Sequence, residues 1–156
     1  MTSGISEHLD KAAGLATAGY AVGLHIRFAA PTYLFRTYDA AWNEHYSASG
    51  LVMRDPVVAW GMSETGAVRW SALAGQDAAG VLREAARFGL AHGATVACLE
   101  GGSRTVAGFA RSDTEFTDAE LAELEALVAA LHRLTMEGAT LSAADQLAIQ
   151  THSVTS

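Results

Sequence analysis

The sequence has few of the residues that support covalent or metal chemistry. It contains one cysteine, Cys98, among 156 residues. A single cysteine excludes an internal disulfide and a cysteine-based metal cluster, and it fits a reducing compartment. The six histidines contain no H-x-x-x-H pair, and neither a G-x-S-x-G nor a G-x-x-x-x-G-K-[ST] motif occurs. We therefore expect no metal, no cofactor and no enzymatic activity.

Long apolar runs are also absent. No run reaches the roughly 18 residues that a membrane-spanning helix needs. The first 20 residues carry Glu7 and Asp10 and have no basic start before an apolar stretch, so a signal peptide is not expected. These features predict a soluble cytoplasmic protein.

Positive charge is scarce. The chain has 10 Lys and Arg against 17 Asp and Glu, a formal net charge of −7. This balance repels phosphate backbones, so we do not expect this chain to bind nucleic acid directly. Half of the residues are hydrophobic and 17% are charged, which is enough apolar material for one folded domain with its own core.

The periodicity in the first part of the chain predicts a helix and a β-hairpin. Residues 6–20 show a helical stripe that Ser6 would cap. Residues 22–28 alternate apolar and polar side chains, as in a half-buried strand. Ala29, Ala30 and Pro31 predict a turn before a second strand at 32–38.

The rest of the chain predicts further short strands between helices. Asp39 and Asp55 are good helix caps, the second with Pro56 behind it. Strands are expected at 67–71, 94–99 and 105–111, and a helix at 76–88. Thr117 and Glu120 form a capping box for a long helix that Gly138 ends. A weak helical patch at 143–149 follows.

Together these elements predict an α+β fold, a five-stranded antiparallel sheet sandwiched between helix layers. Such sheets often enclose a small-molecule pocket between the sheet and one helix layer. On the long helix, the stripe of Leu121, Leu124, Val128 and Leu131 is compatible with packing on the sheet and with pairing to a second chain.

Aromatic residues and one carboxylate cluster in the middle of the chain. Trp42 and Tyr46 share a helix face at i and i+4, and Tyr38 ends the strand before them. Asp55 follows nine residues later, and Trp70 ends a strand. Trp and Tyr combine flat apolar walls with one polar atom. A pocket of this composition suits an uncharged ligand with an amide and a carbonyl. The alternative interpretation is that the rings are core residues and Asp55 only a helix cap.

The same residues carry a family resemblance. The segments 42–46, 55–58, 69–70 and 86–93 resemble the autoinducer-binding domain of LuxR-type quorum-sensing transcriptional regulators. The resemblance covers about residues 20 to 134 and implies an antiparallel sheet between helix layers, similar to PAS and GAF domains. It implies an autoinducer-binding domain at 1–137, followed by a flexible tail or linker stub at 138–156.

The resemblance also implies the residues that bind an N-acyl-homoserine lactone. Trp42 would donate its indole N–H to the lactone carbonyl, and Asp55 would accept the amide N–H. Tyr38 and Tyr46 would contact the acyl carbonyl or wall the acyl chain. Trp70 would pack on the lactone, and Thr95 would lie near the ligand. Gly93 would permit close backbone approach or a turn.

The sequence departs from the family in two places near the ligand. On the last strand, where members often have Ser or Thr, the chain has residues 107–110 without a hydroxyl, and Phe109 would shorten the pocket. Ala97 stands where many members have Pro. An orphan sensor of a different neutral signal is therefore an alternative.

Two further alternatives belong to other classes of protein. In a structural antagonist, Phe35, Trp60 and Phe109 would fill the cavity. In a lactone hydrolase, Asp55 and His45 would act as acid and base, without the metal set or nucleophile that such an enzyme needs.

The expected partners follow from the resemblance. LuxR-type regulators continue into a DNA-binding helix-turn-helix, but the sequence has no basic recognition helix after Gly138. Two alternatives follow: the chain is the sensor half of such a regulator, or it is a natural protein without a DNA-binding arm. We expect a homodimer or, in the second case, a heterodimer in which the chain pairs with a full-length LuxR-type regulator and blocks it.

Overall fold

The computed structural model describes residues 4–28 and 30–152 of the chain. The strands are short and alternate with helices, as predicted; they are β1 Gly19–Arg27, β2 Ala30–Arg36, β3 Gly66–Arg69, β4 His92–Glu100 and β5 Ser103–Arg111. They form one antiparallel sheet in the order β2-β1-β5-β4-β3. The expected five-stranded antiparallel sheet is confirmed.

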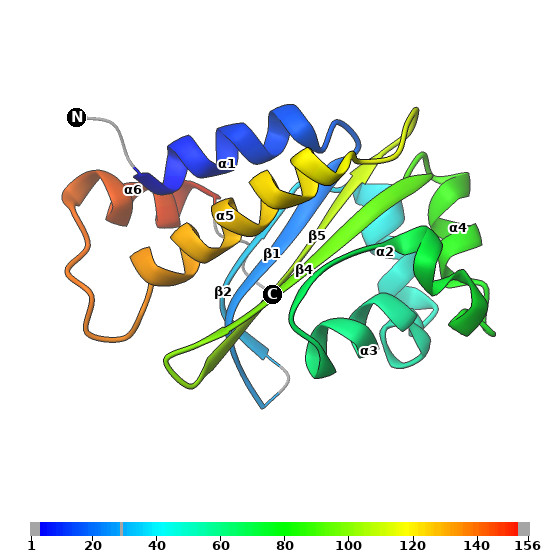
Figure 1. Cartoon of the computed structure of the whole chain (residues 1–156), viewed down its shortest axis with the longest axis horizontal. Helices are drawn as coiled ribbons and strands as arrows, with labels where there is room; N and C mark the ends of the chain where they lie inside the picture. Colours follow the sequence, from blue (N-terminus) through cyan, green and yellow to red (C-terminus); the bar gives the residue numbers. More distant parts are fainter. Residues whose placement is uncertain (1–3, 29, 153–156) are drawn as a thin grey trace.

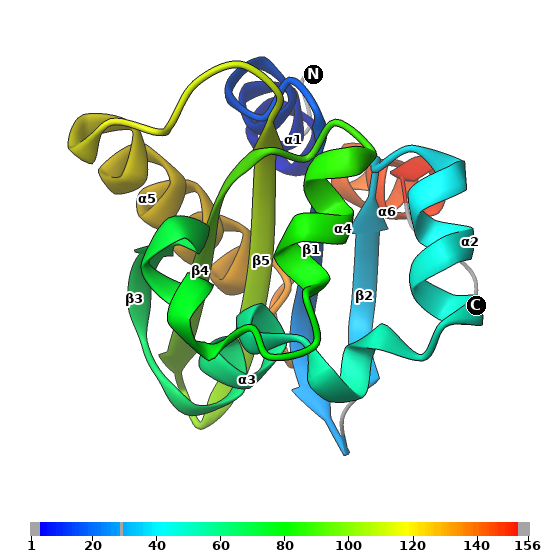
Figure 2. The ribbon, with the colours of Figure 1, turned by 90° about the vertical axis from the view of Figure 1, so that its right-hand side faces the viewer.

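The helices fall into two groups on the two faces of this sheet. They are α1 Gly4–Leu15, α2 Ala40–Ala48, α3 Pro56–Ser63, α4 Val81–Arg87, α5 Asp118–Leu134 and α6 Ala143–His152, with short 3-10 helices η1 Leu51–Arg54 and η2 Trp70–Gln76. Helices α1, α5 and α6 cover one face, and α2, α3 and α4 cover the other (Figure 1). Figure 2 looks onto the face with α2, α3 and α4.

The predicted caps are present. Asp39 accepts a hydrogen bond from the backbone N–H of Ala41, and Asp55 accepts one from Val57. At α5, the Thr117 hydroxyl accepts from Glu120 N–H while the Glu120 carboxylate accepts from Thr117 N–H. These bonds satisfy amides that have no partner within their helix, and they start each helix at the expected place.

The main core lies between the sheet and α1, α5 and α6. Its largest buried side chains include Phe35, Phe109 and Phe116. Leu124, Val128 and Leu131 of the α5 stripe are fully buried in it. The stripe therefore packs on its own sheet, and the alternative of a pairing surface along it is wrong.

The first helix is shorter than predicted. It ends at Leu15, and Tyr20 lies in β1, where its backbone N–H donates to Thr37 Oγ1 at 3.0 Å. Gly19, with φ +111°, makes the turn into the strand. Glycine adopts that conformation without strain. Gly19 therefore marks the turn from the helix into the strand, where a continuing helix was predicted.

The first strand is less regular than its sequence alternation predicts. Its pairing with β5 shifts between Gly23 and Ile26, and His25 has φ +55° and is buried. A bulge of this kind changes which side chains point inward. Phe28, the last residue of the predicted strand, lies beyond the end of β1 and is exposed. Of the predicted turn, Pro31 belongs to β2 and Ala29 lies outside the described residues.

The helical patch predicted after Gly138 is α6. Helix α6 packs beside α1, and its buried Asp145 accepts a hydrogen bond from Ile5 N–H at 3.0 Å. The segment 143–152, predicted as part of a flexible tail, is thus a helix that contacts the domain. Residues 153–156 of that tail lie outside the described residues.

The described residues contain no helix that is long and apolar enough to cross a membrane.

Candidate functional site

A cavity of about 500 Å³ lies between the sheet and the layer formed by α2, η1, α3, η2 and α4. Its walls are mostly apolar, and a few polar groups converge on one part of it, the usual composition of a small-molecule site. Six of the seven predicted ligand-binding residues line it: Tyr38, Trp42, Tyr46, Asp55, Trp70 and Thr95. Residues that are far apart in the sequence are thus brought to one cavity.

Asp55 has contacts on both carboxylate oxygens. Its Oδ1 accepts a hydrogen bond from Val57 N–H at 2.8 Å, and its Oδ2 accepts one from the Tyr46 hydroxyl at 2.8 Å. Burial raises the pKa of Asp55, whereas these hydrogen bonds lower it, and the effect of burial is the larger. Asp55 is therefore a helix cap that also presents a carboxylate to the cavity, and its role in ligand binding stays a prediction.

Tyr38 and Tyr46 keep their hydroxyl protons. Burial, with Asp55 nearby, raises the pKa of both phenols well above 10. The Tyr46 hydroxyl donates to Asp55, whereas the Tyr38 hydroxyl has no hydrogen-bond partner among the described residues. Tyr38 thus presents a hydrogen-bond donor to the cavity.

Trp42 is buried in the roof of the cavity, on α2. Its ring lies 5.5 Å from that of Tyr46 and 5.4 Å from that of Phe88, measured between centroids. Within the described part of the chain, its indole N–H has no hydrogen-bond partner. An indole can only donate, so this group needs an acceptor from elsewhere, such as a ligand or water.

Trp70 and Thr95 are bonded to each other. The Trp70 indole N–H donates to Thr95 Oγ1 at 2.9 Å, and Thr95 is fully buried. Trp70 lies directly over Gly93, where a Cβ atom would come within 2.0 Å of the indole. Gly93 is therefore required for close approach, as the resemblance implies. Because the bond to Thr95 uses the Trp70 N–H, Trp70 offers the cavity its ring face.

Phe109 is the predicted site residue that the structure does not bring to the cavity. It is fully buried on the opposite face of the sheet, in the core with α1 and α5. Side chains alternate along a strand, so Gly108 and Val106 of β5 face the cavity, and Phe109 points away. The prediction that Phe109 shortens the pocket is wrong.

The cavity also tests the antagonist alternative, in which three aromatic side chains fill the space. Phe35 belongs to the opposite core, as Phe109 does, and Trp60 on α3 does not line the cavity. Space for a ligand therefore remains beside Trp42.

Several lining residues were missed by the sequence reasoning. Arg36 lies on β2 and lines the cavity, as do Ala21, Gly23 and Gly108. The small residues leave room above the sheet, and the Tyr38 hydroxyl lies above Gly108, 2.9 Å from where a Cβ would be. Alternation along β1, β2 and β5 predicts which residues share a face of the sheet. It identifies the residues that face the cavity only when the strand register is known.

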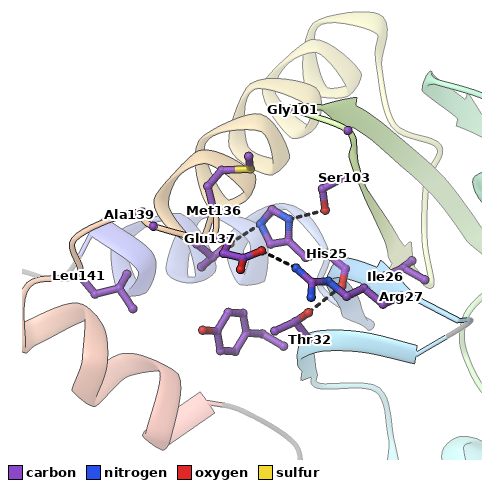
Figure 3. A pocket seen from close by; sticks show the side chains of 14 residues that line it. His25, Ile26, Arg27, Thr32, Gly101, Ser103, Met136, Glu137, Ala139 and Leu141 are labelled. Atoms are coloured by element: carbon purple, nitrogen blue, oxygen red, sulfur yellow. Dashed lines mark hydrogen bonds and ion pairs between the residues drawn. The ribbon is translucent and has the colours of Figure 1, made fainter.

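A second cavity, of about 510 Å³, lies where the β1 bulge and the β4–β5 turn meet the end of α5. Figure 3 shows that two pairs of its polar side chains bind each other: Arg27 pairs with Glu137, and His25 Nδ1 lies 2.7 Å from Ser103 Oγ. His25 Nε2 donates to the carbonyl oxygen of His132 at 3.0 Å. These groups are satisfied internally, so we take the first cavity as the candidate site.

No group of three or more possible metal ligands occurs among residues 4–28 and 30–152.

Comparison with known proteins identifies the family of the domain. The sequence matches the model of the autoinducer binding domain over residues 5–134. The chain belongs to the autoinducer-binding domain family. This is a ligand-sensing family of LuxR-type quorum-sensing regulators, not an enzyme family.

One transcriptional activator is similar to part of the chain. The chain is 36% identical over 94 residues to the transcriptional activator protein SolR of Ralstonia nicotianae. The match covers 60% of this chain and 40% of SolR, so the chain spans well under two thirds of SolR.

Solved structures share the fold of this autoinducer-binding domain. SdiA in complex with octanoyl-rac-glycerol has a TM-score of 0.63 at 19% identity, over 88% of this chain and 62% of that one. The N-acylhomoserine lactone dependent LuxR family factor CepR2 from Burkholderia cenocepacia has a TM-score of 0.56 at 18% identity, over 83% and 90%. At these identities the likeness shows the fold alone.

Proposed function

We propose that this domain binds an N-acyl-homoserine lactone in the cavity beside Trp42. The observation that carries the proposal is the placement of three complementary groups on one cavity. They are the Asp55 carboxylate, the Trp42 indole N–H and the Tyr38 hydroxyl, and the last two have no hydrogen-bond partner among the residues that the structure describes. An acyl-homoserine lactone offers an amide N–H, a lactone carbonyl and an acyl carbonyl, which match these groups one to one.

In this arrangement Asp55 accepts the amide N–H, and Trp42 donates to the lactone carbonyl. Tyr38 donates to the acyl carbonyl, Tyr46 orients Asp55, and Trp70 packs its ring on the lactone. The contact to ionised Asp55 is worth about 1.5–3 kcal/mol. Each buried methylene of the acyl chain adds about 0.8 kcal/mol.

Binding is coupled to stability because the ligand completes the packing of one helix layer. A ligand that binds only the folded domain stabilises it by RT ln(1 + [L]/Kd), about 2.7 kcal/mol at a hundredfold excess over Kd. A thermal-shift series with butanoyl to dodecanoyl homoserine lactones tests the proposal. We expect a rise in Tm that depends on acyl chain length. A well-folded protein that shows no shift with any of these lactones would contradict it.

A different neutral acyl compound is the second candidate. Two observations favour it: the cavity-facing residues of β5, Val106 and Gly108, offer no side-chain donor, and SdiA holds octanoyl-rac-glycerol. Mass spectrometry of the compound that co-purifies from the native host separates the candidates. A lactone mass supports the first, and an acyl ester without a lactone ring supports the second.

We also propose that the occupied domain forms a homodimer, or a heterodimer with a LuxR-type regulator. Family membership supports pairing, and the buried α5 stripe means that another surface must mediate it. Sedimentation of the chain alone, and mixed with such a regulator, each with and without lactone, measures this. Monomers under all conditions would contradict it.

A further inference from the structure

The sheet register arranges the floor of the cavity in rows. Arg36 pairs with Ala21, Ala21 with Gly108, and Gly108 with Thr95, so these four residues lie side by side on β2, β1, β5 and β4. All four line the cavity. Figure 2 shows these four strands next to one another. The row therefore has a polar side chain at each end and two small residues between them.

The next row toward the β1–β2 turn is apolar. Gly23 pairs with Leu34 on β2 and with Val106 on β5, and all three line the cavity. The floor thus changes from polar to apolar along the strands. The Tyr38 hydroxyl lies over Gly108 of the polar row, so an acyl chain whose carbonyl binds Tyr38 and whose tail runs over the apolar row starts from the row that contains Arg36.

Arg36 is the one cationic side chain among the described residues that line the cavity. It is exposed, and it has no ion pair or hydrogen-bond partner in the described part of the chain. Asp55, the lining anion, is bonded to Tyr46 and Val57 instead. The guanidinium therefore has all five N–H donors available for acceptor atoms of a ligand.

We propose that Arg36 recognises an oxygen substituent on the third carbon of the acyl chain, so that the domain prefers 3-oxo-acyl over unsubstituted lactones. This inference rests on the proposed function. The Tyr38 hydroxyl, above Gly108, takes the acyl carbonyl. The next oxygen along the chain lies toward the apolar row, and Arg36, at the β2 end of its own row, donates to it. Ala21 leaves space for the arginine side chain to extend over the floor.

The test compares two lactones of equal chain length by isothermal titration calorimetry on the full chain. The probes are N-octanoyl and N-(3-oxo-octanoyl) homoserine lactone. We expect the wild type to bind the 3-oxo compound about fivefold more tightly, a modest factor because Arg36 stays partly in water. Arg36→Met removes this preference and changes octanoyl affinity less than about twofold. Arg36→Lys, which keeps the charge, retains part of the preference.

A matched control is Arg83→Met, because Arg83 is an exposed arginine on α4 that does not line the cavity. It leaves both affinities unchanged. Wild-type affinities that are equal for the two lactones overturn the inference alone. If Arg36→Met weakens the affinity for both lactones equally, the inference is also overturned, because Arg36 would then contact a group that both lactones share. Absence of binding to either lactone overturns the proposed function and this inference with it.

Discussion

Asp55 stabilises α3, but its burial beside the cavity disfavours its ionised form. Its carboxylate caps the helix and accepts from Tyr46, yet burial disfavours its charge and raises its pKa. Ionisable groups whose charged form is disfavoured by burial often serve binding rather than stability. The charge of Asp55 is therefore expected to matter more with ligand than without it.

The substitution Asp55→Asn tests this balance. An asparagine keeps the cap through its Oδ1 but cannot offer a charged acceptor. We expect affinity for octanoyl homoserine lactone, measured by calorimetry at neutral pH, to fall at least about tenfold. The free protein is expected to lose no more than a few tenths of a kcal/mol.

The pH dependence provides a control for this substitution. Because the folded pKa of Asp55 is raised above its ordinary value of 3.8, its contribution to stability is complete below 3.8 and is lost as pH rises through the folded value. Between pH 3.8 and the folded pKa, the free energy of unfolding of the free wild type, measured in urea, should therefore fall relative to that of Asp55→Asn. A relative stability that rises with pH would contradict this assignment.

Gly93 is required by the position of one ring. A Cβ there would come within 2.0 Å of Trp70, so Gly93→Ala displaces the indole and breaks its bond to Thr95. We expect a loss of about 1–3 kcal/mol in denaturant unfolding and weaker lactone binding. Gly75→Ala is the control, because no atom lies within 4 Å of a Cβ at Gly75. Equal stability of the two variants would show that Trp70 can move freely.

The sequence predicted most of the residues at the site but not their bonds. Tyr38, Trp42, Tyr46 and Asp55 were identified from spacing and resemblance, and they do share a cavity. Arg36 was missed because a charged residue on an edge strand looks like a solvent-facing one. Its location became clear only from the pairing of β2 with β1.

At the scale of elements, α5 depends on its capping box. Thr117 and Glu120 satisfy each other's backbone N–H groups, and Arg111 also binds the Glu120 carboxylate. Thr117→Ala removes one of these bonds, and we expect it to cost about 1 kcal/mol in urea unfolding. Thr114→Ala, at an exposed position just before the helix, should be neutral. A Thr117→Ala variant as stable as wild type would indicate that α5 is held by packing alone.

Elements with strong local signals were predicted well, and those that depend on distant contacts were not. The caps of α2, α3 and α5 lie where Asp39, Asp55 and Thr117 indicated. The β1 bulge was not predicted, because His25 is buried through bonds to Ser103 and His132, far along the chain. The alternation of apolar and polar residues in the local sequence does not predict such long-range contacts.

At the scale of the whole molecule, the two helix layers differ in what they pack against. Figure 1 shows the two layers on opposite faces of the sheet. Helices α1, α5 and α6 pack on the larger hydrophobic core, whereas a smaller buried cluster and a cavity of about 500 Å³ lie between the sheet and the other layer. Fewer buried contacts permit easier local opening. The second layer should therefore be the less protected one in the free protein.

Hydrogen exchange read by mass spectrometry measures this difference. In the free protein we expect amides of α2 and α3 to exchange faster than those of α5. A saturating lactone should slow α2 and α3 most, and Asp55→Asn at the same lactone concentration should show a smaller effect. Uniform exchange across both layers, with no change on adding lactone, would contradict the coupling of occupancy to folding.

The small residues on the cavity floor have a consequence for divergence among receptors. Ala21 and Gly23 face the cavity, but Val22 between them points into the opposite core. A bulkier residue at either floor position would shrink the chamber without repacking α1 against the sheet. Signal preference in this scaffold can therefore be retuned by single substitutions, in evolution or in the laboratory, while the other half of the domain preserves the fold.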